Sequence, residues 1–92
     1  AMETIDLIKQ VSAAARKEFR ARVQASGLEL ARDNGDSVLI TGWGNAGKNI
    51  GETLEKSGLE WEPVGNGAYR ACAFPLVQRS VSEALQQKPL SI

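Results

Sequence analysis

The chain of 92 residues contains no histidine and only one cysteine. Without histidine it lacks the side chain that most often transfers protons near neutral pH and that activates serine or cysteine nucleophiles. The usual zinc sites are also excluded, because they need several histidine or cysteine ligands. We therefore predict no catalytic residues, no metal site and no cofactor, and we do not expect an enzyme.

The lone Cys72 cannot form a disulfide within the chain, which is compatible with a reducing cytoplasm. Its neighbours Ala71, Ala73 and Phe74 predict a buried position on a strand. No apolar run approaches the roughly 20 residues that a membrane span requires. A basic segment followed by an apolar stretch, which marks a secretory signal, is not visible either. We expect a cytoplasmic protein that makes no membrane contact.

The formal net charge is zero. Dedicated nucleic-acid binders usually carry a clear basic excess, so this balance argues against that class. The charges are distributed unevenly, because residues 1–27 have a basic excess and residues 28–62 an acidic one. The first part of the chain is therefore the better candidate for contact with an acidic surface.

An internal repeat is the most informative pattern. Residues 26–30, SGLEL, return as SGLEW at 57–61, and an Asn-Gly pair follows each copy, at 34–35 and 66–67. A glycine just beyond a helix favours a left-handed stop, and Asn-Gly supplies the positive φ angles of tight hairpin turns. Each copy therefore predicts a helix end, a strand, a turn and a second strand.

Apolar residues at steps of three and four predict a long first helix, from residue 3 to about 26. The remaining predicted elements are a hairpin with strands 28–32 and 37–43, a short helix over about 46–57, a hairpin with strands 59–64 and 68–74, and a last helix over about 75–87. Pro75 suits the first turn of that last helix, and residues 88–92 are predicted to form a tail.

The predicted order is α-ββ-α-ββ-α in a single domain over residues 1–92, with repeat units at about 3–43 and 46–74. We expect a two-layer α+β fold, in which helices cover an antiparallel sheet and share its core. Pro63 lacks a backbone donor, so its strand is predicted at a sheet edge. Poor alternation over residues 37–40 favours a central strand covered on both faces or a strand at a subunit contact, and a homodimer is one possibility for so small a domain.

Residues 38–58 read VLITGWGNAGKNIGETLEKSG and contain three overlapping motifs. After an apolar strand, Gly42, Gly44 and Gly47 resemble the G-x-G-x-x-G turn of Rossmann domains, which implies a dinucleotide at a helix N-terminus. An Asn-Gly hairpin follows here, in place of the parallel βαβ unit of that family. Residues 42–48 also resemble the phosphate loop G-x-x-x-x-G-K of nucleoside triphosphatases, with Asn49 where that family places Ser or Thr.

Residues 44–47, with Ile50, Gly58 and Trp61 beyond them, are similar to the G-x-x-G loop and following helix of KH domains. That resemblance implies binding of single-stranded nucleic acid, although a KH loop joins two helices and a strand leads into this one. For the loop as a whole, the candidate residues for binding a phosphate or another small ligand are Gly42, Gly44, Asn45, Gly47 and Lys48.

The alternative interpretation of this loop is structural. Gly42 and Gly44 then allow a sharp turn from strand to helix, Asn45 caps the helix, and Gly47 permits close packing of the helix on the sheet. Gly51, inside the helix, is expected to touch a neighbouring backbone.

Other residues are candidates for contact with a protein partner. Lys9, Arg16 and Arg20 fall on one face of the first helix, and Trp43, flanked by glycines, is predicted to be exposed. The tail QKPLSI resembles the short Gln-x-x-Leu-x-apolar peptide with which bacterial replication and repair proteins dock on the sliding clamp. In that peptide the anchors would be Gln87, Leu90 and Ile92.

These observations predict a small non-enzymatic binding module that acts by protein–protein interaction. An accessory, regulatory or inhibitory role, of the kind found in phages and mobile elements, fits the small size and neutral charge. The alternative is a KH-like or Rossmann-like binder of nucleotide or single-stranded nucleic acid that uses the glycine loop.

Overall fold

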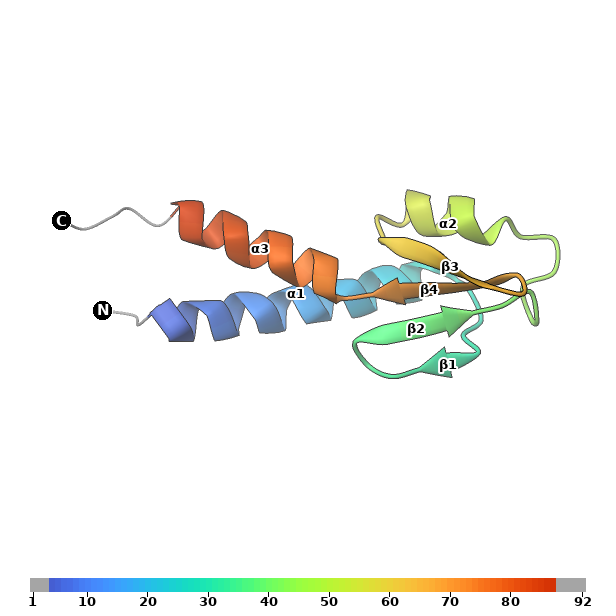
Figure 1. Cartoon of the computed structure of the whole chain (residues 1–92), viewed down its shortest axis with the longest axis horizontal. Coiled ribbons are helices and arrows are strands. Elements are labelled where there is room, and N and C mark those ends of the chain that lie inside the picture. Colours follow the sequence, from blue (N-terminus) through green and yellow to red (C-terminus); the bar gives the residue numbers. More distant parts are fainter. Residues whose placement is uncertain (1–3, 88–92) are drawn as a thin grey trace.

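The computed structural model describes residues 4–87. The elements follow the predicted order α-ββ-α-ββ-α and form a two-layer α+β fold (Figure 1). They are α1 (Thr4–Ser26), β1 (Arg32–Asp33), β2 (Ser37–Ile40), α2 (Ile50–Lys56), β3 (Trp61–Gly65), β4 (Ala68–Cys72) and α3 (Phe74–Gln87).

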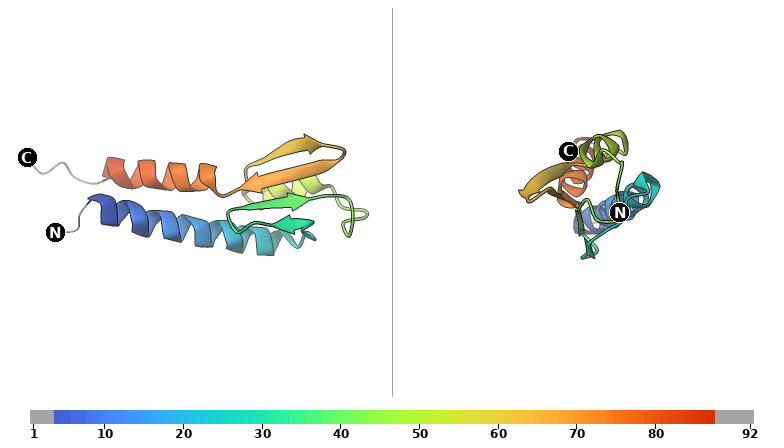
Figure 2. Two further views of the ribbon diagram at one scale, coloured as in Figure 1. Left: turned by 60° about the horizontal axis from the view of Figure 1, so that its bottom comes forward. Right: turned by 90° about the vertical axis from the view of Figure 1, so that its right-hand side faces the viewer.

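The four strands form one antiparallel sheet in the order β1-β2-β4-β3. β3, which contains Pro63, lies at an edge as predicted, and β2 is central. The prediction that this central strand is covered on both faces is wrong, because burial alternates along Ser37–Ile40. The C-terminal half of α1 and all of α2 lie against the same face of the sheet (Figure 2). No helix in the described part of the chain covers the opposite face.

The core lies between the sheet and these two helices. On β2, Val38 and Ile40 are buried and point into it, whereas Ser37 and Leu39 face the other side of the sheet. The largest fully buried side chains are Phe19 of α1, Leu54 of α2 and these two strand residues. Cys72 is paired with Ser37, lies on the outer face and is only half-buried, so the predicted buried position is wrong.

Both predicted helix stops are confirmed, with φ of 68° at Gly27 and 75° at Gly58. In the second copy, the backbone N–H of Leu59 donates to the carbonyl of Leu54 at 3.0 Å, the bond that defines a Schellman stop. Leu54 and Leu59 also belong to the same apolar core, as the repeat predicted.

The first copy closes in a different way. The hydroxyl of Ser26 donates to the carbonyl of Val23 at 2.6 Å and accepts the backbone N–H of Leu28 at 3.3 Å. The serine hydroxyl thus stands between the two groups that would otherwise bond directly. The end of α1 therefore has the same left-handed glycine as the end of α2, but the Ser26 hydroxyl bridges the two backbone groups.

The first hairpin is shorter than predicted. Its strands cover only Arg32–Asp33 and Ser37–Ile40, because Leu28 turns into the core and the backbone of Glu29 bonds to a side chain instead of a strand. The second hairpin follows the prediction more closely, and its turn has positive φ at both Asn66 and Gly67, 54° and 73°.

The short helix α2 begins at Ile50, four residues later than predicted. Asn49 is its N-cap, since the Asn49 side chain accepts the backbone N–H of Glu52 at 3.0 Å. The prediction that Asn45 caps this helix is therefore wrong. Gly47 was expected to allow close packing, but a Cβ there would meet nothing within 4 Å; the residue instead adopts φ of 78°.

The molecule is elongated, with extents of 56 × 22 × 20 Å. The elongation comes from α1 and α3, which run side by side in opposite directions away from the sheet (Figures 1 and 2). We call residues 4–18 of α1 together with α3 the arm. Neither α1 nor any other described helix has the length and apolarity that crossing a bilayer requires.

Candidate functional site

The glycine loop, residues 41–49, is organised around the buried side chain of Asn45, which is 2% exposed. Its amide oxygen accepts the backbone N–H of Glu29 at 2.8 Å. Its amide nitrogen donates to the carbonyl of Glu29 at 3.0 Å and to that of Thr41 at 2.8 Å. A buried amide with these bonds fixes the loop to the segment that follows α1.

The loop gathers all five residues of the predicted phosphate site, but its polar side chains have partners within the protein. Asn45 is bonded as described, and the ammonium group of Lys48 donates to the carbonyl of Gly27 at 3.0 Å. That contact places a cation at the C-terminal end of α1, where the helix dipole favours it. Gly44 lies over the side chain of Glu29, whose Cγ would be 3.0 Å from an added Cβ.

Trp43 projects from this loop and is 85% exposed, which confirms its predicted exposure. Its backbone N–H donates to the hydroxyl of Thr41 at 3.2 Å, so its main chain is held although its ring is free. Val64, 42% exposed, was not singled out from the sequence. The sequence did contain a signal for this exposure, because Val64 is an apolar residue next to a hairpin turn on the strand that Pro63 predicts at the sheet edge.

Trp43 and Val64 lie at the same end of the molecule. β2 and β3 are both antiparallel to β4, so they run in the same direction. Val64 is near the end of β3, and Trp43 comes three residues after the end of β2. The loop lies at the opposite end of the long axis from the tip of the arm (Figure 1).

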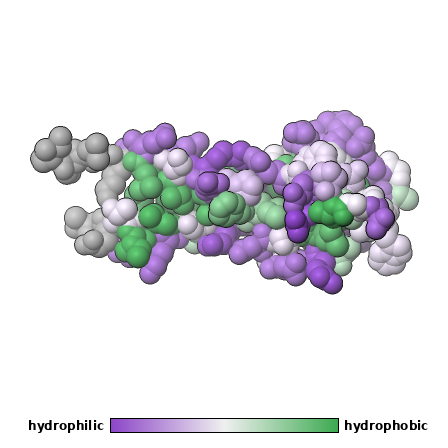
Figure 3. All heavy atoms as spheres, in the orientation of Figure 1, coloured by the Kyte–Doolittle hydropathy of each residue, from purple (hydrophilic) through white to green (hydrophobic). Residues whose placement is uncertain are grey.

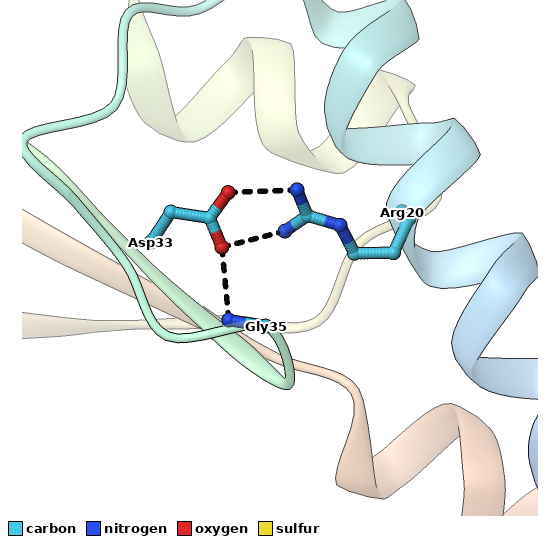
Figure 4. A network of polar contacts seen from close by, with 3 residues as sticks. All are labelled: Arg20, Asp33 and Gly35. Atoms are coloured by element: carbon cyan, nitrogen blue, oxygen red, sulfur yellow. Dashed lines mark hydrogen bonds and ion pairs between the residues drawn. The ribbon is translucent and has the colours of Figure 1, made fainter.

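Two members of the predicted cationic stripe bind the first hairpin of the same chain. The guanidinium of Arg20 donates two bonds of 2.7 Å to Asp33, which also accepts the backbone N–H of Gly35 at 2.9 Å (Figure 4). Arg16 lies 3.5 Å from Asp36. Lys9 is exposed on the arm, so the three cations do not form one free surface.

The pair formed by Arg20 and Asp33 shifts the ionisation of both groups. The hydrogen bonds from Arg20, with that from Gly35, lower the pKa of Asp33 below its ordinary value. The hydrogen bonds to Asp33 and its negative charge raise the pKa of Arg20. The pair therefore holds the β1–β2 hairpin to the side of α1.

The acidic residues before and on β3 have individual basic partners. Glu62 pairs with Arg70 across the strands, and Glu60 pairs with Arg79 of α3. Within residues 4–87, no three acidic or cysteine side chains come together as a set of metal ligands.

The predicted clamp-docking peptide falls largely outside the described residues. Gln87 is the last residue of α3, whereas Leu90 and Ile92 lie beyond residue 87. This hypothesis therefore stays a prediction from the sequence.

Comparison of the chain with models of protein families, with curated proteins and with solved structures gave no match.

Proposed function

We propose that the protein is a non-enzymatic, cytoplasmic module that binds another protein through the end that carries Trp43 and Val64. The observation that carries this proposal is the 85% exposure of the Trp43 side chain. Tryptophan is enriched among the few residues that dominate the energy of protein interfaces. An indole so open to water gains most from burial in a partner's pocket.

The loop beneath Trp43 is suited to binding because it is already ordered. The buried Asn45 amide and the Thr41 hydroxyl bond its backbone before any partner arrives. Binding then costs little further ordering of the loop, which favours affinity. An accessory, regulatory or inhibitory role follows from occupation of a partner's surface.

The test is an affinity pull-down from the native host with wild type and Trp43→Ala, followed by calorimetry with the purified partner. Loss of a central indole should weaken binding by about 30-fold or more. Phe74→Ala is the matched control, because Phe74 is also an exposed aromatic residue, 68% exposed, but lies at the base of the arm. Equal affinity of Trp43→Ala and wild type for every partner captured would refute the proposal.

A second experiment separates this function from phosphate binding. Heteronuclear NMR spectra are recorded with ATP, NAD and short single-stranded oligonucleotides. The docking proposal expects no selective shifts at residues 44–48. Selective, saturable shifts there would replace it by the nucleotide or nucleic-acid alternative.

A further inference from the structure

The repeat contains two Asn-Gly pairs, 34–35 and 66–67, and this sequence is chemically reactive. The backbone nitrogen of the glycine can attack the side-chain carbonyl carbon of the asparagine, because glycine has no side chain to hinder the approach. A nitrogen–carbon bond forms, the bond from that carbon to the amide nitrogen breaks, and the glycine proton leaves with the amide group as ammonia. Water then opens the cyclic succinimide at either carbonyl, which gives aspartate or isoaspartate.

Exposure does not distinguish the two pairs. Asn34 and Asn66 are both exposed to solvent, and both lie in hairpin turns. Each is followed by glycine, so the two should react at similar rates in the unfolded chain. A difference in the folded protein must therefore come from the contacts that hold each turn.

In the first pair, a charged group holds the attacking nitrogen. The N–H of Gly35 donates to the carboxylate of Asp33 at 2.9 Å, and the guanidinium of Arg20 holds that carboxylate with two bonds of 2.7 Å (Figure 4). The attack requires that the charge-assisted bond to Gly35 break. It also requires loss of the Gly35 proton, which the negative charge of Asp33 opposes. Two effects therefore protect this pair.

The second pair has neither protection. Within residues 4–87, no group accepts the backbone N–H of Gly67, and residues 63–69 include no charged side chain. Asn66 has φ of 54°, and in this left-handed conformation the next nitrogen lies opposite the side chain across the Cα–C bond. The turn must therefore open before the attack. It lies at the end of the exposed edge strand β3, so the opening disrupts few contacts.

We propose that Asn66 is a site of spontaneous deamidation in the folded protein, whereas the carboxylate of Asp33 protects Asn34. The amide group leaves as ammonia, and water is the only other reactant. No partner takes part, so the site is independent of the function proposed for Trp43.

The product changes the chemistry of the end that carries Trp43. Deamidation places a negative charge in the turn beside Val64, and isoaspartate also adds a carbon atom to the backbone. Residues 37–47 and 63–69, which contribute to this end, contain no charged residue. In Figure 3 the tip at this end is mostly pale, the colour of intermediate hydropathy. The new charge therefore appears on a surface that has almost none before the reaction.

The first test compares the two asparagines in one sample. The purified chain is incubated in mildly alkaline buffer, digested with trypsin and analysed by mass spectrometry, which detects replacement of NH2 by OH. Cleavage after lysine and arginine places the two sites in different peptides, 33–48 and 57–70. Conversion at Asn66 should be at least about 10-fold faster than at Asn34, since the latter must first break a hydrogen bond to a charged group. Equal rates, or a faster reaction at Asn34, would overturn the proposal.

The second test removes the protecting carboxylate. Asp33→Ala should accelerate conversion of Asn34 by about 10-fold and leave Asn66 unchanged. Asp36→Ala is the matched control, because it removes a carboxylate from the same turn that does not bond to the N–H of Gly35. It should change neither rate, and circular dichroism verifies that both variants fold. In urea, the two asparagines of the wild type should react at similar rates. An unchanged rate at Asn34 in Asp33→Ala, or a difference that persists in urea, would refute protection by the fold.

Discussion

The side-chain amide of Asn45 lies against the backbone of Glu29 and bonds to both its N–H and its C=O, at 2.8 and 3.0 Å. In an antiparallel sheet, a residue can form the same two bonds, through its N–H and its C=O, with a neighbouring strand. This one side chain therefore takes the place of a strand beside the segment after α1. It explains why the first hairpin is short and why the loop with Trp43 has a fixed shape.

Replacement of Asn45 by alanine should destabilise the fold by about 2–4 kcal/mol, because it leaves several backbone groups without partners at a buried position. The loss is measured by urea denaturation, and amide exchange of Glu29 should rise with it. Asn49→Ala removes only the N-cap of α2 and should cost about 1 kcal/mol. Equal losses in the two variants would contradict the role assigned to Asn45.

Gly42 and Gly47 occupy the first and last glycine positions of the loop motif but differ in backbone conformation. Gly47 has φ of 78°, whereas Gly42 has no positive φ, and an added Cβ meets nothing within 4 Å at either residue. Gly47→Ala should cost about 1–2 kcal/mol for the left-handed conformation. Gly42→Ala should be neutral or stabilising by up to about 1 kcal/mol, because it restricts the unfolded chain. Thermal denaturation of both variants checks the difference in sign.

Gly51 packs against Trp61, the residue that corresponds to Leu30 in the repeat. A Cβ at residue 51 would be 3.1 Å from the Cη2 atom of Trp61, so Gly51→Ala should destabilise by about 1–3 kcal/mol despite alanine's better helix propensity. The contact is with a side chain, where a neighbouring backbone was predicted. In a Trp61→Leu background the same change should become neutral or favourable. A double-mutant cycle measures this, and additive effects would exclude the contact as the cause.

The ion pair between Arg20 and Asp33 predicts a pH dependence. The pKa of Asp33 is lowered in the folded protein, so its contribution to stability is full above the unfolded pKa of about 3.9 and is lost as pH falls through the folded value. In Arg20→Gln the pKa of Asp33 should rise toward its ordinary value, as followed by carboxyl carbon NMR. Arg16→Gln should leave it unchanged, because Arg16 pairs with Asp36. If both variants shifted the pKa of Asp33 equally, the loss of one positive charge would explain the shift, and the pairing with Arg20 would not.

Features with a local signal were predictable from the sequence. The two glycine stops, the Asn-Gly turn at 66–67 and the edge position of Pro63 each depend on the conformational limits of one or two residues. The order of the elements followed from these signals and the helical spacing. The exposure of Trp43 followed from the glycines beside it, which leave few side chains nearby to cover it.

Features that depend on distant partners were not predictable. Asn45 finds its partner 16 residues away, so its sequence neighbours suggested only a helix cap. The face on which Cys72 lies depends on the register between β2 and β4. The arm forms because the strands are short and the helices extend beyond the sheet. The amphipathic pattern of a helix is the same with or without a sheet beneath it, so the pattern did not predict the arm.

Helix α1 runs without interruption from the tip of the arm to its stop at Gly27. Its first half lies in the arm, and its last half contributes Phe19 and Val23 to the core under the sheet. No hinge separates the two parts, so order imposed on the arm is transmitted along the helix to the sheet. For this reason the arm and the sheet should unfold in one cooperative transition, so that helical circular dichroism and the fluorescence of Trp61 report the same midpoint.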